Sequence, residues 1–395
     1  MKTQNNELPK DIPSWLADLI SNDSLEIEEV SASDILPHLG KLGQLRKLTL
    51  TYVDDLTDLP LSLTKLKNLE ELNIEGADFK HFPSVIASLT SLQSFSYINC
   101  NCPLPEVFNA LSALPQLKKL RFTHHADKNG DFLPESFGHL QAIEELHFND
   151  WPALRELPEC IGDMRNLRII NLSHDDHQLY YDIAMIQKLP DSLGNISKLE
   201  ELDIFGLDNL KHLPSSFKRL SNLKRLDTVC SGIDELHLTP EQWNNLEGLC
   251  MHGPLPDMRQ CANLKQFYYF KNGVGSDASG IPFGIYERIS MPITPLRKLE
   301  SLQIMGGALG ETDFLASLTN LRSLFLYCDF KSFPKGFENL NKLEEISIQY
   351  AKSLVFLPEY LGHMPSLKKL RLDRCGVKEL PKSVRERSGL VIDVR

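Results

Sequence analysis

A single arrangement of apolar and polar positions recurs along almost the whole chain. In its first copy, leucines occupy the first, fourth and sixth positions of the segment Leu45-x-x-Leu48-x-Leu50. The last two apolar positions lie two residues apart, so their side chains share one face of a β-strand while the intervening residues occupy the other face. Successive copies mostly begin about 24 residues apart, which predicts a repeat of short strands with one buried face. The further copies begin at Leu69, Leu92, Leu117, Ile143, Leu167, Leu199, Leu223, Leu246, Leu264, Leu299, Leu321, Leu343 and Leu367.

A second apolar set follows most of these strands and carries a proline. In the first repeat it consists of Leu59-Pro60, Leu63 and Leu66. The three-residue spacing is typical of a short helix or 3₁₀ turn, and proline fits its first turn because no N–H is needed there. No such unit can bury its apolar residues alone, so neighbouring units must stack and share one core. The pattern predicts an α/β solenoid whose parallel sheet is about 60 Å long, at roughly 4.8 Å per strand.

The strand pattern and the Leu-Pro-x-x-apolar-x-x-Leu segment resemble leucine-rich repeats of the plant-intracellular, Ras-group type, over about residues 25–390. Similar repeats occur in plant intracellular immune receptors and in effector proteins that bacterial pathogens deliver into host cells. The resemblance implies a leucine-rich-repeat horseshoe with a parallel concave β-sheet, short helices or 3₁₀ turns on the convex side, and a binding role with no inherited catalytic residues. The family's usual asparagine after the strand is replaced by Cys100, Trp151, Asp175, Asp329 and Cys375, so the asparagine ladder is incomplete.

Both ends of a solenoid need a cap, because an open end exposes the core. Residues 1–24 are expected to supply the N-terminal cap, since Pro13 to Ile20 reads as a short amphipathic helix. Residues 25–389 hold about 14 repeats, and residues 390–395 are expected to add a C-terminal capping strand.

Three steps between repeats depart from the usual length. The step from Leu167 to Leu199 is long and predicts an insertion near 173–188, and the long step from Leu264 to Leu299 predicts another near 271–295. The step from Leu246 to Leu264 is short and lacks the usual helix-forming segment. Irregular inserts in a regular array are typical of a functional edge.

The residue after the first apolar position alternates in charge from repeat to repeat. When the strands stack in register, this row predicts a ladder of opposite charges, with each pair contributing about 0.2–1 kcal/mol. The row is interpreted as structural, because its charges neutralise one another. Its members are Arg46, Glu70, Gln93, Lys118, Glu144, Arg168, Glu200, Lys224, Glu247, Lys265, Glu300, Arg322, Glu344 and Lys368, of which Gln93 alone breaks the alternation.

The residues predicted to face outward from the concave sheet change character along the chain. They are polar in the early repeats and include large apolar side chains in the later ones. Exposed aromatic side chains favour a partner-binding site, because such anchors carry most of the binding energy at protein interfaces. The alternative is that an inserted loop or a second copy of the chain covers them. The predicted partner-binding residues are Phe205, Val229, His252, Tyr268, Phe270, Met305, Phe325, Tyr327 and Tyr350.

Composition and charge narrow the function. Hydrophobic residues make up 42% and charged residues 24% of the chain, as in an ordinary globular protein. The formal net charge of -11 would repel nucleic acid and an anionic membrane, so neither is expected as a partner. The first residues lack the apolar run of a secretory signal, which predicts a cytoplasmic protein with reduced cysteines, or one delivered into a host cytoplasm by another route.

Two loop clusters contain metal-ligand residue types. His174-Asp175-Asp176-His177 are four adjacent residues and cannot all converge on one ion. His124, His125 and Asp127 invite the same idea, and in both places solvated loop residues are the simpler interpretation. No metal site is predicted.

Nucleotide binding and thiol chemistry are also weakly signalled. Gly273 to Ala278 fits a dinucleotide-binding glycine pattern, but the following Ser279-Gly280-Ile281-Pro282 would break the required helix, so a flexible loop is predicted. Cys250 is expected on the exposed sheet face, without the motif of a cysteine enzyme around it. No catalytic residue and no cofactor are predicted. Cys230, Cys328 and Cys375 are expected to turn toward the core.

The sequence therefore favours a protein-binding scaffold that is not an enzyme, such as a bacterial effector acting on host proteins. One alternative is the substrate-recognition part of a ubiquitin-ligase effector, although the repeats leave no room for a catalytic domain in this sequence. The other alternative is a structural homodimer formed through the apolar concave patch.

Overall fold

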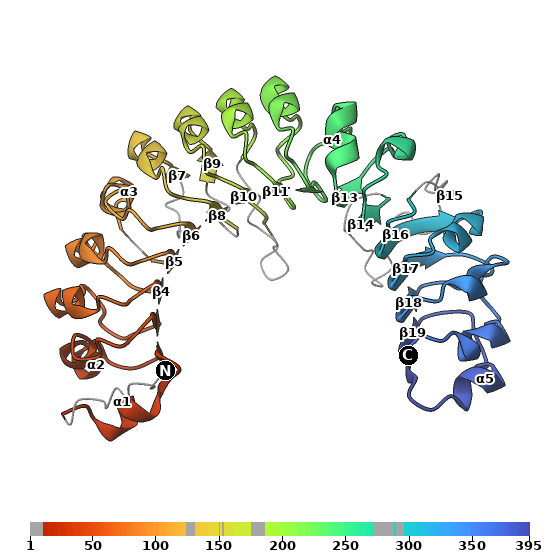
Figure 1. Cartoon of the computed structure of the whole chain (residues 1–395), viewed down its shortest axis with the longest axis horizontal. Coiled ribbons are helices and arrows are strands. Elements are labelled where there is room, and N and C mark those ends of the chain that lie inside the picture. The colour runs from red at the N-terminus through yellow and green to blue at the C-terminus, as the bar shows by residue number, and fades with distance from the viewer. Residues whose placement is uncertain are drawn as a thin grey trace, which may run out of the picture. The chain divides into compact units, whose positions relative to one another are not determined.

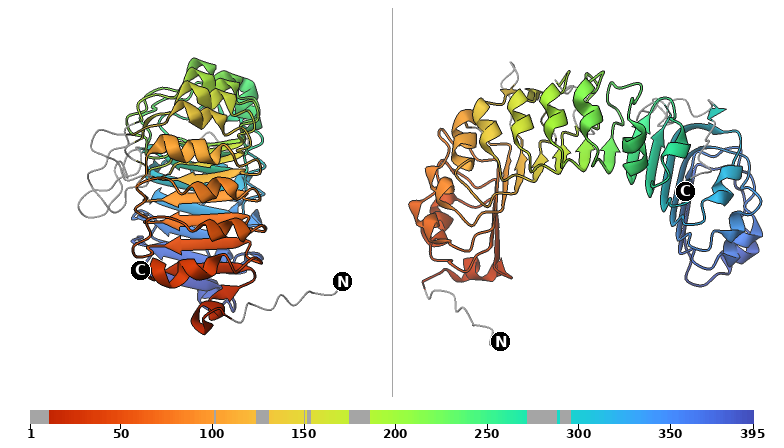
Figure 2. Two further views of the ribbon diagram at one scale, coloured as in Figure 1. Left: turned by 90° about the vertical axis from the view of Figure 1, so that its left-hand side faces the viewer. Right: turned by 45° about the horizontal axis from the view of Figure 1, so that its top comes forward.

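The computed structural model describes residues 11–100, 102–123, 131–149, 151, 154–174, 186–271, 288–289 and 296–395. It divides into two compact units. The N-terminal unit comprises Met1–Leu202 with Leu207–Leu220, and the C-terminal unit comprises Asp203–Gly206 with Ser221–Arg395. Within each unit the strands lie side by side along one side, and helices and 3₁₀ turns line the other (Figure 1 and Figure 2).

The N-terminal unit starts with a short helix. Helix α1 (Ser14–Asp18) follows Pro13 and buries Leu16 completely. Its other apolar side chains remain in solvent, with Trp15 40% and Leu19 45% exposed. Leu16 is therefore the residue through which this helix contributes to the apolar interior.

The helix is shorter than the sequence predicted. Ile20 belongs to strand β1 (Ile20–Ser21), which pairs antiparallel with β2 (Ser24–Glu28). Asn22 and Asp23 have positive φ angles and form the tight turn between the two strands. Asparagine and aspartate tolerate this left-handed conformation better than most residues. The helix ends early because the chain must reverse here to start the sheet.

The strands of the N-terminal unit pair in parallel and in chain order from β2 to β10. Equivalent repeat positions face each other, so that Leu48 lies opposite Leu72 and Leu72 lies opposite Phe95. This register confirms the parallel sheet predicted from the spacing of the leucines. The strands are β3 (Lys47–Thr51), β4 (Glu71–Glu75), β5 (Ser94–Ile98), β6 (Lys119–Phe122), β8 (Glu145–His147) and β10 (Ile169–Asn171), while β7 (Asp131–Phe132) pairs separately with β9 (Leu154–Glu156).

Short helices and 3₁₀ turns cover the inner face of this sheet. Each 3₁₀ turn of this unit follows directly on the proline of a Leu-Pro or Phe-Pro segment, as η1 follows Pro60, whose φ is −72°. The following apolar residue, Leu63 in this repeat, is completely buried. The elements are α2 (Ala32–Leu39), η1 (Leu61–Lys65), η2 (Ser84–Ser88), α3 (Leu104–Leu111), η3 (Glu135–His139), η4 (Glu159–Asp163), η5 (Asp191–Asn195) and η6 (Ser215–Arg219).

The C-terminal unit repeats this arrangement. Strand β11 (Glu201–Asp203) ends at the first residue of this unit, and β12 (Arg225–Asp227) pairs in parallel with the next strand along the chain. The other strands are β13 (Gly248–His252), β14 (Gln266–Phe270), β15 (Arg288–Ile289), β16 (Ser301–Leu309), β17 (Ser323–Asp329), β18 (Glu345–Gln349), β19 (Lys369–Asp373) and β20 (Val391–Val394). The helical elements are α4 (Pro240–Asn245), η7 (Met258–Gln260), η8 (Asp313–Ser317), η9 (Phe337–Asn339), η10 (Glu359–His363) and α5 (Lys382–Arg385).

The chain leaves many of these strands through one residue in the left-handed conformation, seven positions after the first leucine. Glycine occupies this place in some repeats, and in Gly76 an added Cβ would lie 2.3 Å from the Tyr52 ring. Side chains occupy it in others, including Tyr52, Asn99, Cys230, Tyr350 and Arg374. The left-handed conformation costs about 1–2 kcal/mol for a residue with a Cβ, so stacking must offset that cost at each of these turns.

One position after the site of the left-handed residue in the repeat, other side chains occupy the place of the family's usual asparagine. The Cys100 thiol donates to the carbonyl oxygen of Ile98 at 3.1 Å, and its sulfur accepts the N–H of Ala77 at 3.4 Å. Asp329 accepts the N–H and the hydroxyl of Ser353 at 2.8 and 2.6 Å. Both side chains thus hydrogen-bond a backbone N–H of an adjacent repeat, and buried backbone groups are almost always paired in this way.

Most residues of the predicted insertions near 173–188 and 271–295 lie outside the described residues. Among the residues that the structure does describe, no helix is long and apolar enough to cross a membrane.

Candidate protein-binding surface

The outward face of the N-terminal sheet is polar and carries paired charges. Lys47 lies 3.2 Å from Glu71, and Lys119 lies 3.0 Å from Glu145, and each pair joins two adjacent strands. His147 lies 3.4 Å from the same Glu145 carboxylate, and burial lowers the pKa of its imidazole. This face offers little apolar area to a partner.

The outward face of the C-terminal sheet brings together six of the nine residues predicted to bind a partner. The parallel register places Tyr268 opposite Gln303, which in turn lies opposite Phe325. Two residues further along the same strands, the outward positions form a second row of apolar side chains and one histidine. We call the six residues the aromatic face: His252, Tyr268, Phe270, Met305, Phe325 and Tyr327.

The structure corrects the expected exposure of three predicted residues. Val229, Phe270 and Tyr350 are only 1%, 9% and 5% exposed. The N–H of Val229 donates to Asp227 Oδ1 at 2.9 Å, which closes a turn directly after β12 and ends the alternation of the strand. Tyr350 occupies one of the left-handed positions, so its side chain also leaves the strand alternation. These three side chains therefore offer almost no accessible surface to a partner. Phe205, by contrast, is half-buried.

Arg374 organises the edge of the aromatic face next to β17 and β18. Its Nη1 donates to the Tyr350 hydroxyl at 2.5 Å, and its guanidinium lies 5.1 Å from the centre of the Tyr350 ring. The Tyr350 and Tyr327 rings are in contact, with centroids 4.9 Å apart. Burial, followed by the hydrogen bond with Tyr350, raises the pKa of Tyr327 to about 12. Sequence reasoning missed Arg374, although it occupies the same position as Tyr350 in the next repeat along the chain.

Two aspartates lie beside the aromatic face at equivalent positions of β11 and β12. Asp203 Oδ1 accepts the N–H of Phe205 at 3.0 Å, in the same geometry that Asp227 adopts with Val229. Burial, and then the negative charge of Asp203, raise the pKa of Asp227 to about 7. A carboxylate here is costly, because like charges on neighbouring strands repel each other.

Cys250 on β13 lies next to this carboxyl group. The sequence predicted an exposed thiol, but the side chain is largely covered, and burial together with the Asp227 carboxyl raises the pKa of the thiol. A nucleophilic cysteine needs a lowered pKa. Cys250 is therefore poorly suited to covalent catalysis.

The other candidate chemistry finds no support within the described residues. In that part of the chain, no group of three or more His, Cys, Asp or Glu side chains is placed to hold a metal ion. His174 is described, whereas Asp175, Asp176 and His177 lie outside the described residues. The cluster of His124, His125 and Asp127 and the segment from Gly273 to Ala278 also lie outside them.

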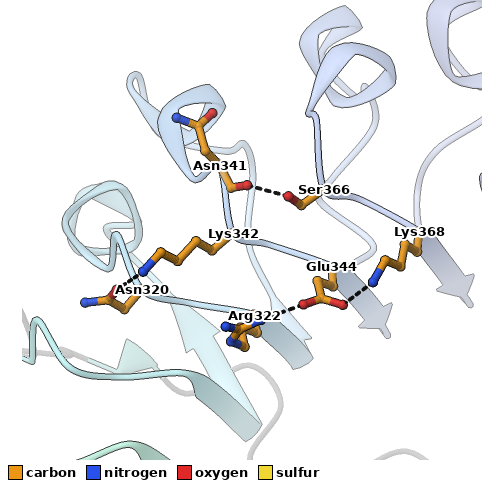
Figure 3. Close-up of polar contacts among 7 residues, drawn as sticks. All are labelled: Asn320, Arg322, Asn341, Lys342, Glu344, Ser366 and Lys368. Atoms are coloured by element: carbon orange, nitrogen blue, oxygen red, sulfur yellow. Dashed lines mark hydrogen bonds and ion pairs between the residues drawn. The ribbon is translucent and has the colours of Figure 1, made fainter.

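The alternating charged row forms ion pairs along the edge of both sheets. In the N-terminal unit Arg46 lies 2.8 Å from Glu70. In the C-terminal unit Glu344 accepts hydrogen bonds from Arg322 at 2.8 Å and from Lys368 at 2.5 Å (Figure 3). This contact confirms the structural interpretation of the row, since the charges satisfy one another.

A second ladder, which sequence reasoning missed, runs beside the first. It uses the residue directly before the first apolar position of most repeats. Asn320 donates to the carbonyl oxygen of Arg297 at 2.7 Å. It also accepts from Lys342 at 2.7 Å, while Ser366 donates to the carbonyl oxygen of Asn341 at 2.6 Å (Figure 3). The recurrence of Asn, Lys and Ser at this one position was the available signal.

The comparisons with known proteins agree with the repeat architecture. Residues 24–178 match a family model described as a leucine-rich repeat region. A disease resistance-like protein of Arabidopsis thaliana is 26% identical over 206 residues, which cover 47% of this chain and 16% of that protein. A volume-regulated anion channel subunit of Homo sapiens is 25% identical over 247 residues, which cover 61% of this chain and 29% of that protein. The chain thus spans less than a third of these relatives' lengths.

A solved structure shows the same fold. A leucine-rich-repeat protein of Leptospira interrogans superposes with a TM-score of 0.57 at 19% identity, covering 94% of this chain and 89% of that chain. Stacked strand and 3₁₀ units with one outward sheet face define a solenoid repeat protein. The chain has the fold of the leucine-rich-repeat family, and residues 24–178 match its family model. Proteins of this family are generally scaffolds for protein interactions and typically have no enzymatic activity.

Proposed function

We propose that this chain is a scaffold that binds a partner protein on the outward sheet face of its C-terminal unit. The carrying observation is the aromatic face, where Tyr268 on β14 and Phe325 and Tyr327 on β17 lie on either side of β16 and are partly exposed. Large aromatic side chains that already sit on a rigid sheet lose little conformational freedom on binding. The proposed site includes the half-buried Phe205, whereas Val229, Phe270 and Tyr350 are almost completely buried and add little surface of their own.

The test is affinity purification from cell lysate with wild type and the double variant Tyr268→Ala/Phe325→Ala. Loss of two interface aromatics is expected to weaken partner binding at least about 30-fold. The matched control is Tyr52→Ala/Phe356→Ala, which removes the same two residue types from exposed positions away from the face. Retention of the same bound proteins by the first variant would contradict the assignment of the site.

The proposed setting is the cytoplasm, or a host cytoplasm reached as a bacterial effector. It rests on the resemblance of the repeats to those of plant intracellular receptors and pathogen effectors. Parallel purifications from bacterial and host lysates would test it, because an effector is expected to retain a protein from the host lysate. A partner found only in the bacterial lysate would argue against this setting.

Two competing functions predict different outcomes. A homodimer through the aromatic face would show twice the monomer mass in light scattering, and Tyr268→Asp would abolish that mass. A ubiquitin-ligase role would require transfer activity that Cys250→Ala removes. The raised pKa of the Cys250 thiol argues against that role, since the thiolate is the nucleophile.

A further inference from the structure

The outward face of the C-terminal unit contains a stretch without charge. Strands β13, β14, β16 and β17 are paired in parallel, and each has three outward positions in register with those of its neighbours. None of these positions holds Asp, Glu, Lys or Arg. The strands on either side differ, because β12 carries Arg225 and Asp227 outward and β18 carries Glu345. We call the charge-free stretch the neutral window.

The chemistry of the neutral window selects an uncharged segment. Tyr268, Met305, Phe325 and Tyr327 supply partly exposed apolar surface, and Gln303 offers an amide between the two tyrosine strands. A charged side chain pressed onto this surface would lose water and find no opposite charge, which is strongly unfavourable. An apolar side chain gains by covering it.

The size of the neutral window indicates a short segment. Four strands about 4.8 Å apart and five residues of about 3.3 Å each enclose roughly 250 Å². A stable protein interface needs about 800 Å² on each side, so the window is too small to hold a second copy of the chain by itself. An extended stretch of about five residues matches its dimensions.

The two borders of the neutral window differ in charge. On the β18 side, Lys369 lies 2.7 Å from Glu345, and Arg371 lies 3.4 Å from Asp393, so opposite charges are paired. On the β12 side, the half-buried Asp227 has a second carboxyl group, Asp203, as its neighbour, and burial together with that charge raises the pKa of Asp227. A cation placed there would relieve this repulsion.

The turn after β12 does not itself require a carboxylate. In the N-terminal unit, Asn171 Oδ1 accepts the N–H of Ser173 at 2.9 Å in the same geometry that Asp227 adopts with Val229. An amide can therefore make this contact without the cost of a second charge. The same comparison supplies a variant, Asp227→Asn, that keeps the backbone contact while removing the charge.

We propose that the neutral window binds a short, uncharged apolar segment of a protein whose adjoining residue, lying against Asp227, is a lysine or arginine. The inference rests on the proposed function, because it names the chemistry of the partner at the same face. The formal charge of -11 on the chain also favours a basic partner.

Six synthetic fluorescein-labelled peptides test the inference by fluorescence anisotropy. All contain the core Leu-Phe-Leu-Phe-Leu, preceded or followed by two lysines, two glutamates or two serines. We expect a lysine peptide to bind wild type at least about tenfold more tightly than its glutamate counterpart. The preference is expected to weaken as salt rises, since it is electrostatic in origin.

Three variants separate the parts of the inference. Asp227→Asn should lower the preference for lysine over serine at least threefold while leaving the serine peptide unaffected. Tyr268→Ser should weaken all peptides about tenfold, whereas the control Tyr52→Ser should weaken none, because Tyr52 lies in the N-terminal unit. Circular dichroism verifies that each variant is folded.

Equal binding of the lysine and glutamate peptides to wild type, or binding of none below about 1 mM, would overturn the inference. The affinity purification with Tyr268→Ala/Phe325→Ala distinguishes this failure from failure of the proposed function. If that double variant loses a partner that wild type retains, the scaffold function stands and only the chemistry assigned to the partner is wrong.

Discussion

Replacing Asp227 by asparagine should stabilise the protein, and the gain should depend on pH. The raised pKa of about 7 means that the folded protein favours the protonated carboxyl group, whereas the unfolded chain ionises it near 3.8. Stability present at low pH is therefore lost as pH rises from about 4 to about 7. At 1.36 kcal/mol per pH unit, the gap between these values corresponds to about 4 kcal/mol, as an upper limit.

Part of this loss of stability has already occurred at pH 5. The remaining loss between pH 5 and pH 8 is about 2.5 kcal/mol. Water reaches a half-buried carboxyl group, and we therefore expect the advantage of Asp227→Asn over wild type to grow by about 1–2 kcal/mol across that range. The asparagine should retain the contact with Val229, as Asn171 does with Ser173 in the N-terminal unit.

Urea unfolding followed by circular dichroism at pH 5, 6, 7 and 8 measures this gain. The exposed Asp163 in η4 provides a control, and Asp163→Asn should show no pH-dependent gain. A gain of Asp227→Asn that is the same at every pH, or a loss at pH 8, would refute the reasoning. Either result would mean that burial and the neighbouring carboxylate do not destabilise the ionised form.

Three further substitutions test the repeat architecture. Gly76→Ala should lower the free energy of unfolding by more than about 1 kcal/mol, because its φ is +71° and the new Cβ would lie 2.3 Å from the Tyr52 ring. Gly43→Ala, whose Cβ would have 3.9 Å to its nearest neighbour, should be nearly neutral in the same urea titration. Phe122→Ala removes a completely buried ring and should cost about 3–5 kcal/mol, and a loss below about 1 kcal/mol would be inconsistent with the core. Glu344→Gln should lower the unfolding midpoint only at low salt, with the difference gone at about 1 M, because its two cationic partners are exposed.

Much of the repeat could be read from spacing alone. Leu45, Leu48 and Leu50 are close in sequence, so the period of two within a strand and the period of about 24 between strands are visible without knowledge of distant contacts. The alternating charges one residue after the first leucine could be read for the same reason. Register follows from the repeat, and register is what places Arg46 beside Glu70.

The ends of the strands could not be read in this way. Val229 and Tyr350 lie just beyond the ends of their strands, where the outward alternation no longer applies. Both side chains are buried, and the Tyr350 ring is in contact with Tyr327 and Arg374. The second ladder was missed because its polar side chains contact the backbone of a neighbouring repeat. Such a contact leaves a signal only when equivalent positions such as Asn320 and Lys342 are compared across repeats.

The sequence by itself determined that the chain stacks, in which register it stacks, and that apolar residues collect on the later strands, because each of these follows from a local pattern repeated many times. Only the tertiary structure decided which of those residues remain exposed and how the neighbouring groups ionise. Exposure and pKa sum contributions from side chains many residues apart, as Asp203 and Cys250 contribute at Asp227, and no local pattern contains that sum.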